Sequence, residues 1–184
     1  MQCPKCENQP LRATKLEQGL SAMGCNQCNG AFVTLLYYRD WLERTPLVES
    51  QVVEQKNMAK ALIQVNDSKT ALCCPKCSRL MNKYKISGES DNRIDLCASC
   101  DEVWLDGGEW ELLKIFELSR KMPLVFTEQW QRKLRKQATQ QAREQRLLKI
   151  ASQDDLDEAK KVRVWLAEHP FREQILFFIN QDID

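Results

Sequence analysis

Histidine is nearly absent from this sequence, since His169 is the only one among 184 residues. It stands directly before Pro170, at an expected helix end, so we expect a cation at a helix C-terminus and not a catalytic base. The sequence contains no glycine-rich phosphate loop and no nucleophile elbow around a serine. We therefore expect a protein that is not an enzyme and that has no small-molecule substrate.

Long hydrophobic runs are also missing. The longest, residues 175–179, is far shorter than the roughly 20 apolar residues of a membrane-spanning helix. The first residues show neither the basic stretch nor the apolar core of a signal peptide, so we expect a cytoplasmic protein with no membrane partner. A net charge of +1 with 43% hydrophobic residues excludes a chain that is disordered by composition or uniformly basic.

Cysteine, in contrast, is abundant. An odd count of nine without a signal peptide argues against a disulfide framework. Eight of the cysteines form Cys-x-x-Cys pairs, and the first pair, Cys-Pro-Lys-Cys, recurs letter for letter at mid-chain. A second pair follows the first after 18 residues in one copy and 19 in the other. The two quartets are Cys3, Cys6, Cys25 and Cys28, and then Cys74, Cys77, Cys97 and Cys100.

We predict one structural Zn²⁺ in each quartet, two per chain. Two facing Cys-x-x-Cys turns supply four thiolates in a tetrahedron, which leaves no coordination position for water or substrate. Cys73 is expected outside both sites, as a buried small hydrophobe or a weakly reactive thiol, because the repeat aligns Cys74 with Cys3. We call each Cys-x-x-Cys turn a knuckle. Lys5 and Lys76 lie inside the first knuckle of each quartet, and we expect their positive charges to offset the negative charge of the thiolates. A Cys₄ tetrahedron can also hold a single iron, so a redox or iron-binding, rubredoxin-like protein is the alternative.

The segments between the cysteine pairs indicate hairpins. Apolar residues flank turn residues at 17–19 in the first copy and at 87–92 in the second. A helix should follow each hairpin, and Asp106 with Glu109 has the spacing of a capping box. The first copy has Thr34 where Asp106 stands. The sequence therefore predicts a small α+β fold: two tandem Cys₄ zinc ribbons, each followed by a helix, plus an all-helical C-terminal extension.

This organisation divides the chain into four segments. They are the first zinc ribbon and its helix (1–45), a helical linker (46–70, with its helix over 46–65), the second zinc ribbon and its helix (71–122), and the helical C-terminal extension (123–184). Within the extension we expect a long helix over 127–150 and a helix pair over 154–168 and 171–180, broken by Pro170.

Around the quartets the sequence resembles the bacterial zinc-ribbon family of the transcription-factor-IIB type. The resemblance covers about half of the chain and implies a fold and a metal, and only loosely a function. The first copy keeps the cysteines and Gly30, with Phe32 in place of the family tryptophan, and the second departs at Glu102, where glycine is usual, and at Trp110, where leucine is. Matching positions of the second copy are its four cysteines, Pro75, Trp104, Leu105, Asp106, Gly108 and Glu109. We expect Trp104 to wedge between hairpin and helix.

The C-terminal extension divides by charge. Residues 128–150 hold seven basic side chains against two acidic ones, and residues 154–184 hold eight acidic against four basic. Arg132, Lys133, Arg135 and Lys136 are candidate phosphate contacts for a nucleic acid. Two alternatives are a solvated helix that packs one edge on the ribbon or a partner helix, and an antiparallel arrangement in which the acidic segment neutralises the basic one.

The apolar residues near the C-terminus also allow two interpretations. We expect a small helical hairpin core, and the alternative is an exposed partner-binding face; the residues are Trp165, Phe171, Ile175, Phe178 and Ile179. Together these features predict a zinc-binding, non-enzymatic interaction module. Its partner is a protein, a nucleic acid or both, and a link to transcription is implied by the resemblance alone.

Overall fold

The computed structural model describes residues 1–45 and 67–181. The chain divides into two compact units, Met1–Arg135 and Lys136–Asp184. The helix predicted over 46–65 lies outside the described residues, and residues 67–70, also assigned to the linker, contain no helix. None of the described helices is both long enough and apolar enough to span a membrane.

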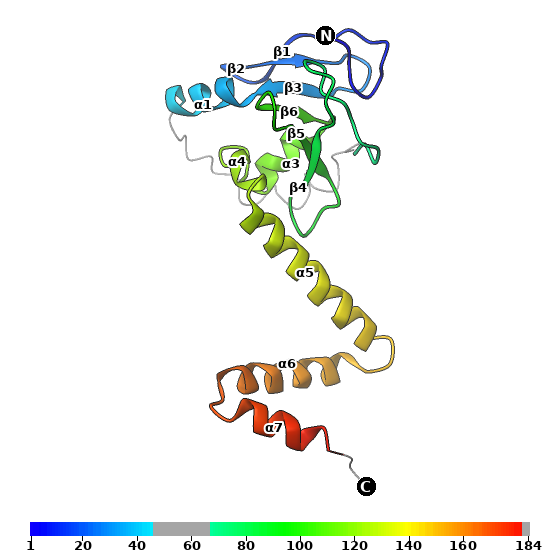
Figure 1. The fold of residues 1–184 in the computed structure, drawn as a ribbon, viewed down its shortest axis with the longest axis vertical. Coiled ribbons are helices and arrows are strands. Elements are labelled where there is room, and N and C mark those ends of the chain that lie inside the picture. Colours follow the sequence, from blue (N-terminus) through cyan, green and yellow to red (C-terminus); the bar gives the residue numbers. More distant parts are fainter. Residues whose placement is uncertain (46–66, 182–184) are drawn as a thin grey trace. The chain divides into compact units, whose positions relative to one another are not determined.

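The first ribbon is a three-stranded antiparallel unit followed by a helix (Figure 1). Strands β1 (Arg12–Glu17) and β2 (Leu20–Gly24) form a hairpin, and its turn contains Gly19 at φ +83°, a left-handed conformation that glycine adopts without strain. β3 (Ala31–Thr34) pairs with β2, and helix α1 (Leu35–Arg44) begins at the next residue. The predicted hairpin and helix are confirmed.

The second ribbon repeats this arrangement. Its hairpin and third strand are β4 (Asn82–Lys85), β5 (Arg93–Cys97) and β6 (Glu102–Leu105), and helix α3 (Glu109–Ile115) follows. A short helix, α4 (Met122–Val125), comes after α3 and carries a proline in its first turn, where the missing N–H of proline costs nothing. The predicted small α+β fold is therefore confirmed in both copies.

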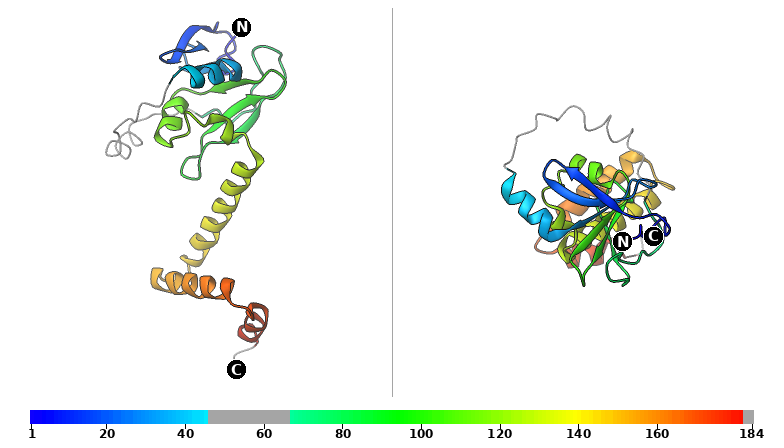
Figure 2. Two further views of the ribbon diagram at one scale, coloured as in Figure 1. Left: turned by 90° about the vertical axis from the view of Figure 1, so that its left-hand side faces the viewer. Right: turned by 90° about the horizontal axis from the view of Figure 1, so that it is seen from above.

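The two ribbons share one antiparallel sheet, with strand order β1-β2-β3-β6-β5-β4 (Figures 1 and 2). The third strands meet at the centre, and Phe32 lies opposite Trp104. Each of these two residues stands four positions after the last cysteine of its quartet. On either side of this pair, Ala31 lies opposite Leu105 and Val33 lies opposite Val103. These two pairs are equivalent to each other, because exchanging the ribbons converts one into the other. This register relates the two ribbons by an approximate two-fold axis through the Phe32–Trp104 pair, as in an isologous dimer.

The sheet separates two hydrophobic clusters. Side chains alternate between the faces of a strand, so Val33 and Val103 point to one cluster while Phe32 and Trp104 point to the other. The first cluster includes buried residues of α1 and α3, among them Tyr38. The second contains all eight paired cysteines, four of them buried and four partly buried. Both metal sites therefore belong to one face of the shared sheet.

Asp106 does not cap its helix in the predicted way. The N-cap of α3 is Gly108, at φ +91°, and no side chain caps the helix. Half of the capping box is present, because the Asp106 N–H donates to Glu109 Oε2 at 2.9 Å. The Asp106 carboxylate instead accepts hydrogen bonds from the Ser68 N–H at 2.6 Å and from Trp104 Nε1 at 3.0 Å. Both bonds are buried, and leaving either donor unpaired would cost more free energy than the missing cap.

The predicted C-terminal helices are present as α5 (Glu128–Leu147), α6 (Gln153–Glu168) and α7 (Arg172–Ile179). Ser152 starts α6 with a complete capping box: its hydroxyl accepts from the Asp155 N–H, and the Asp155 carboxylate accepts from the Ser152 N–H. The break between α6 and α7 falls at Pro170, as expected.

The predicted apolar core of this helix pair is wrong. Trp165 is 51% exposed and Phe178 is 75% exposed, and in the described part of α6 and α7 only Leu156 and Leu166 are buried. The reason is the pattern: residues 175–179 are apolar in succession, and at about 100° per residue they surround the helix, so one neighbouring helix cannot cover them. The alternative interpretation, an exposed face, agrees with the structure.

His169 is the C-cap of α6, as predicted from its place before Pro170. Its Nδ1 accepts a hydrogen bond from the Phe171 N–H at 3.1 Å. The ring lies beside Trp165 and Phe171, with centroid distances of 5.1 and 6.1 Å. His169 therefore belongs to a group of three rings where α6 ends.

Candidate metal centres

Each quartet is formed by two tight turns that share one backbone conformation. The residue after the second cysteine of every knuckle has a positive φ: Glu7 at 49°, Asn29 at 56°, Ser78 at 60° and Asp101 at 54°. In three knuckles the N–H of this residue donates to the carbonyl of the first cysteine, at 2.8–3.0 Å. The left-handed residue closes the turn and brings both thiols to one side. Sequence reasoning missed this feature, although asparagine and aspartate at two of the positions are residues that tolerate it.

The sulfur atoms are spaced as a tetrahedral metal requires. In each quartet all four lie within 4.8 Å of one another. The Sγ atoms of Cys3 and Cys28 are 3.6 Å apart, and those of Cys77 and Cys97 are 3.5 Å apart. A Zn–S bond of about 2.3 Å predicts about 3.8 Å along a tetrahedron edge. The two quartets can each hold a zinc ion, and Cys74, not Cys73, belongs to the second, as predicted.

Without a metal ion the crowded thiols cannot all ionise. Burial raises the pKa values of Cys3 and Cys74. Burial also acts on Cys25, but the backbone N–H groups of Cys28 and Gln27 outweigh it and lower the pKa of Cys25 to about 7. In the second quartet the Arg79 N–H is the main reason that the pKa of Cys77 is lowered to about 7. A metal that binds four thiolates must therefore displace protons, and its affinity falls as pH falls.

Cys73 lies outside both quartets, as predicted, but it is exposed and not buried. It forms an isolated β-bridge with Leu80, across the base of the second knuckle. Because neighbouring residues of an extended segment point to opposite sides, Cys74 turns inward to its quartet and Cys73 turns outward. The expectation of a buried small hydrophobe was wrong for this reason.

Trp104 lies beside both metal sites. It is fully buried in the cluster that contains the cysteines, and its indole ring packs against Gly30 in the other ribbon. A Cβ atom at Gly30 would come within 2.2 Å of Trp104 Cζ2. The predicted wedge between hairpin and helix is wrong, because Trp104 lies on the cysteine face of the sheet, opposite α3, and its ring reaches across to the first ribbon.

The two knuckle lysines pair with carboxylates. Lys5 Nζ lies 3.3 Å from Asp106 Oδ1, so the first knuckle is bound to the second ribbon. Lys76 Nζ lies 2.7 Å from Glu102 Oε1, and this ion pair is the main cause of the raised pKa of Lys76. Electrostatic attraction by Cys100 and Cys74 raises the pKa of Lys76 further, so Lys76 also interacts with the cysteine quartet. Each lysine was expected to offset the charge of its cysteine quartet, and in the structure it also pairs with a buried carboxylate.

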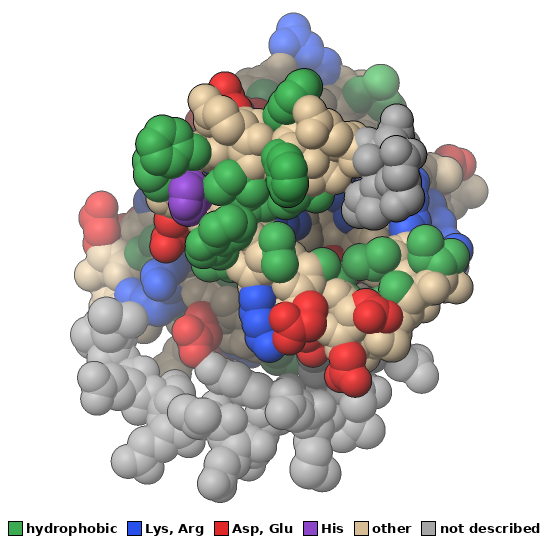
Figure 3. All heavy atoms as spheres, turned by 90° about the horizontal axis from the view of Figure 1, so that it is seen from below, with side chains coloured by type: hydrophobic (Ala, Val, Ile, Leu, Met, Phe, Trp, Pro, Cys, Tyr) green, Lys and Arg blue, Asp and Glu red, His purple; other side chains and the backbone are tan. Residues whose placement is uncertain are grey.

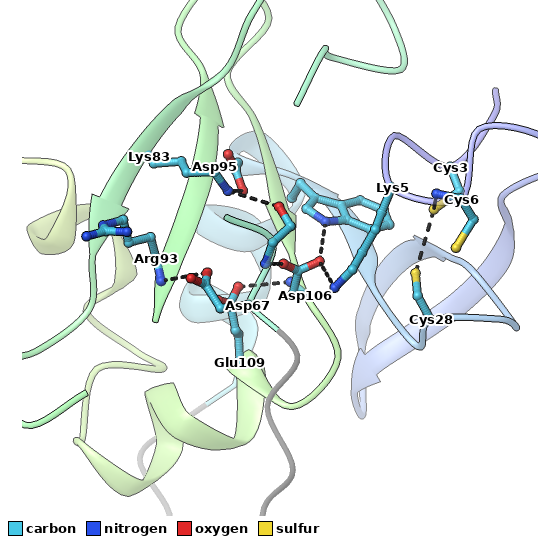
Figure 4. Close-up of polar contacts among 12 residues, drawn as sticks. Cys3, Lys5, Cys6, Cys28, Asp67, Lys83, Arg93, Asp95, Asp106 and Glu109 are labelled. Carbon is cyan, nitrogen blue, oxygen red and sulfur yellow. Dashed lines mark hydrogen bonds and ion pairs between the residues drawn. The ribbon is translucent and has the colours of Figure 1, made fainter. Parts of the chain in front are cut away.

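A group of buried acidic side chains surrounds Asp106, and sequence reasoning missed it (Figure 4). Asp95, Asp106 and Glu109 are 0–2% exposed. Burial raises the pKa of Asp95 to about 6, against the opposing effect of Lys83, whose Nζ is 2.9 Å from Asp95 Oδ2. Burial also raises the pKa of Glu109 well above its usual value. The repeat could not reveal this group, because Asp95 lies on β5, apart from the pair Asp106 and Glu109.

The four candidate nucleic-acid contacts lie on α5. Arg132, Lys133, Arg135 and Lys136 are all exposed, and Arg135 forms an ion pair with Glu128. Lys133 Nζ lies over the Trp130 ring, 5.7 Å from its centroid. Their contact with a nucleic acid stays a prediction.

The acidic segment does fold beside the C-terminal end of α5, but it does not neutralise the helix in the expected sense. Lys160 of the acidic segment pairs with Glu144 of the basic one, at 3.0 Å. Arg163 Nη1 donates to Gln140 Oε1 at 2.7 Å. The α6 side chains in both contacts are basic, although most charged residues of α6 are acidic. The basic side chains Arg143 and Arg146 of α5 therefore stay exposed.

Two Cys₄ quartets, each in a unit of two knuckles and a hairpin, give residues 1–45 and 67–122 the fold of two tandem zinc ribbons. Residues 2–44 match the model of the Transcription factor zinc-finger family, the zinc ribbon of transcription factor IIB. The second quartet, at residues 74–100, is consistent with a tandem copy. The predicted resemblance is thereby confirmed for residues 2–44. No curated protein and no solved structure matches the chain.

Proposed function

We propose that the chain is a non-enzymatic interaction module in which the two zinc ribbons form a structural scaffold and the C-terminal helices bind a protein. The four thiolates of each quartet complete the coordination of a tetrahedral ion, so neither site offers the open position that metal catalysis needs. Zinc in this role stabilises the fold.

The exposed apolar surface of α6 and α7 carries the proposal. Phe171, Phe177 and Phe178 are 63–75% exposed, and Trp165 is about half exposed. Figure 3 shows hydrophobic side chains gathered around the single histidine. Large apolar patches of this kind mark interaction sites in soluble proteins. Helices as short as these derive most of their stability from packing, which a partner would supply.

The chemistry of the groove between α6 and α7 indicates the kind of partner. Its volume is about 530 Å³, and its lining is apolar apart from Arg163 and Arg172. An amphipathic helix with an apolar stripe and acidic flanks fits both properties, because helices bind such grooves through residues at i, i+3 and i+4. The two guanidinium groups then face carboxylates at the rim.

A matched pair of substitutions tests this proposal. Val162 lines the groove and is 46% exposed, whereas Val164 is 62% exposed and does not line it. The full chain is used to capture proteins from a nuclease-treated lysate, with capture quantified by mass spectrometry. We expect Val162→Glu to abolish capture of a specific protein that the wild type and Val164→Glu both retain. Equal capture by both variants would refute the groove as the binding site. A wild-type dimer that Val162→Glu dissociates, seen by sedimentation, would show that the groove holds a second copy instead.

A nucleic-acid partner is the second candidate, favoured by the exposure of four basic side chains on α5. Replacing all four with glutamine removes charge and keeps helix propensity. If they contact phosphates, log K against log salt should have a slope of about −0.9 per contact on duplex, and the variant should lose it. Absence of binding to DNA and RNA at about 50 mM salt would rule this candidate out. A visible spectrum with elemental analysis separates zinc from the iron-binding alternative.

A further inference from the structure

Three carboxylates from two distant segments of the chain converge beside the second ribbon (Figure 4). Asp67 precedes the second knuckle, Asp106 follows β6, and Glu109 begins α3. One oxygen of each lies within 4.8 Å of one oxygen of both others. Oxygens around a cation with bonds of about 2.3–2.6 Å are separated by no more than about 5 Å. The spacing therefore matches the coordination sphere of a cation.

Each carboxylate is oriented by a backbone N–H. The Arg93 N–H donates to Asp67 Oδ1 at 3.3 Å, the Ser68 N–H to Asp106 Oδ2 at 2.6 Å, and the Asp106 N–H to Glu109 Oε2 at 2.9 Å. Such bonds fix the direction of the carboxyl groups before a ligand arrives, as the outer shell of a metal site does.

Glu109 shows that this arrangement lacks a component. Its side chain is 0% exposed, and among the described residues its Oε1 atom has no hydrogen-bond partner. Figure 4 shows the Glu109 carboxyl group lying between those of Asp67 and Asp106. Burying a carboxylate oxygen without a hydrogen-bond partner destabilises the fold more than losing an ordinary hydrogen bond does. A ligand bound to Glu109 Oε1 would remove this cost.

The charge of the site points to a divalent cation. Four carboxylates interact here, because Asp95 adds its field to those of Asp67, Asp106 and Glu109. The described cations paired with them are Lys5 at Asp106 and Lys83 at Asp95. With all four carboxylates ionised, four negative charges face the two described lysines, so one divalent cation would balance the group. Without a cation, burial and mutual repulsion raise the pKa values of Asp95 and Glu109 instead.

We propose that Asp67, Asp106 and Glu109 bind one hard divalent cation, Mg²⁺ or Ca²⁺, in addition to the zinc in the cysteine quartets. Oxygen donors suit these ions, and thiolates suit zinc, so the two kinds of site select different metals. The half-buried Asp67 gives the ion its route from solvent. The bound cation ties the segment at Asp67 to the start of α3, and through Asp106 and Lys5 to the first knuckle.

The test uses the zinc-loaded full chain and three cations as probes. Mn²⁺, followed by electron paramagnetic resonance, reports one saturable site per chain, and competition with Mg²⁺ and with Ca²⁺ distinguishes the two ions. We expect saturation at or below about 1 mM, the weak end of protein Ca²⁺ sites. Glu109→Gln keeps the acceptor for the Asp106 N–H and should weaken binding at least tenfold. Asp67→Asn should do the same, and the exposed Glu111→Gln, on the same helix, should leave affinity unchanged.

Two controls keep the outcomes distinct. Each variant must retain two zinc ions per chain, which shows that both ribbons are folded. The cation should raise the melting temperature of the wild type and of Glu111→Gln, and should leave that of Glu109→Gln unchanged. No saturable Mn²⁺ site up to about 1 mM, or equal binding by Glu109→Gln and Asp67→Asn, would overturn the proposal.

Discussion

Gly30 of the first ribbon lies against the Trp104 ring of the second, so Gly30→Ala tests the packing of the two ribbons. A Cβ there would lie 2.2 Å from Trp104 Cζ2, 2.7 Å from Cη2 and 3.0 Å from Cε2. The ring cannot turn away easily, because Trp104 Nε1 donates to Asp106 and the whole side chain is buried. An added methyl group must therefore move one ribbon relative to the other.

The size of the effect follows from these distances. Ordinary van der Waals contact begins near 3.4 Å, so the closest ring atom must shift by about 1 Å. Overpacking in a rigid core costs about 1–3 kcal/mol, and a ring held between two cysteine quartets belongs at the upper end of that range. A loss of about 3 kcal/mol lowers the melting temperature of a unit of this size by about 10 °C.

The assay is thermal unfolding of Gly30→Ala with zinc content measured in parallel. A double-mutant cycle identifies the cause: Trp104→Leu removes the opposing ring, so Gly30→Ala should cost much less in that background than in the wild type. If Gly30→Ala costs the same with and without Trp104, the loss comes from the backbone of the knuckle and the packing argument is wrong.

Two further predictions concern the metal and pH. Cys77→Ser should leave one zinc ion per chain and should also destabilise the first ribbon, because β3 and β6 pair directly and zinc binding is worth on the order of 10 kcal/mol; retention of two zinc ions would contradict it. Burial raises the pKa of Tyr38 to about 12. Because this folded-state value exceeds the ordinary one near 10, the stabilisation is complete below pH 10 and is lost as pH rises toward 12, by about 2 kcal/mol. Tyr38→Phe should lack this component of the alkaline slope in denaturant titrations, and equal slopes would show that Tyr38 does not titrate there.

The parts of the structure that could be predicted from sequence are those fixed by short-range spacing. Two Cys-x-x-Cys pairs that share one metal ion each form a tight turn, and an alternating apolar segment with a central turn between them indicates a hairpin. The quartets and both hairpins followed from this. The helices followed from periodicity and from Pro170, because those signals also lie within one segment.

The parts that could not be predicted depend on contacts between distant segments. No local signal indicates that β3 pairs with β6, and that pairing decides where Trp104 and Lys5 make their contacts. Asp106 was given a capping role from spacing alone, but buried donors from Ser68 and Trp104 compete for its carboxylate. A buried hydrogen-bond donor from a distant segment can thus outweigh the local preference of a carboxylate for a helix cap, because an unpaired buried donor is costly.

Differences between the two copies compensate for one another across the central strand pair. Asp106 accepts the Lys5 ion pair, and the first copy has Thr34 at the equivalent position, so Lys76 lacks the corresponding acid there. Glu102, directly opposite Thr34 in the sheet, supplies it: Oε1 pairs with Lys76 at 2.7 Å, and Oε2 accepts from Thr34 Oγ1 at 2.8 Å. The same alignment sets Glu102 where the first copy has Gly30, whose space the Trp104 ring occupies. Thr34 in the first ribbon and Glu102 in the second thus compensate for each other across the sheet, as expected if the two ribbons fold as one unit.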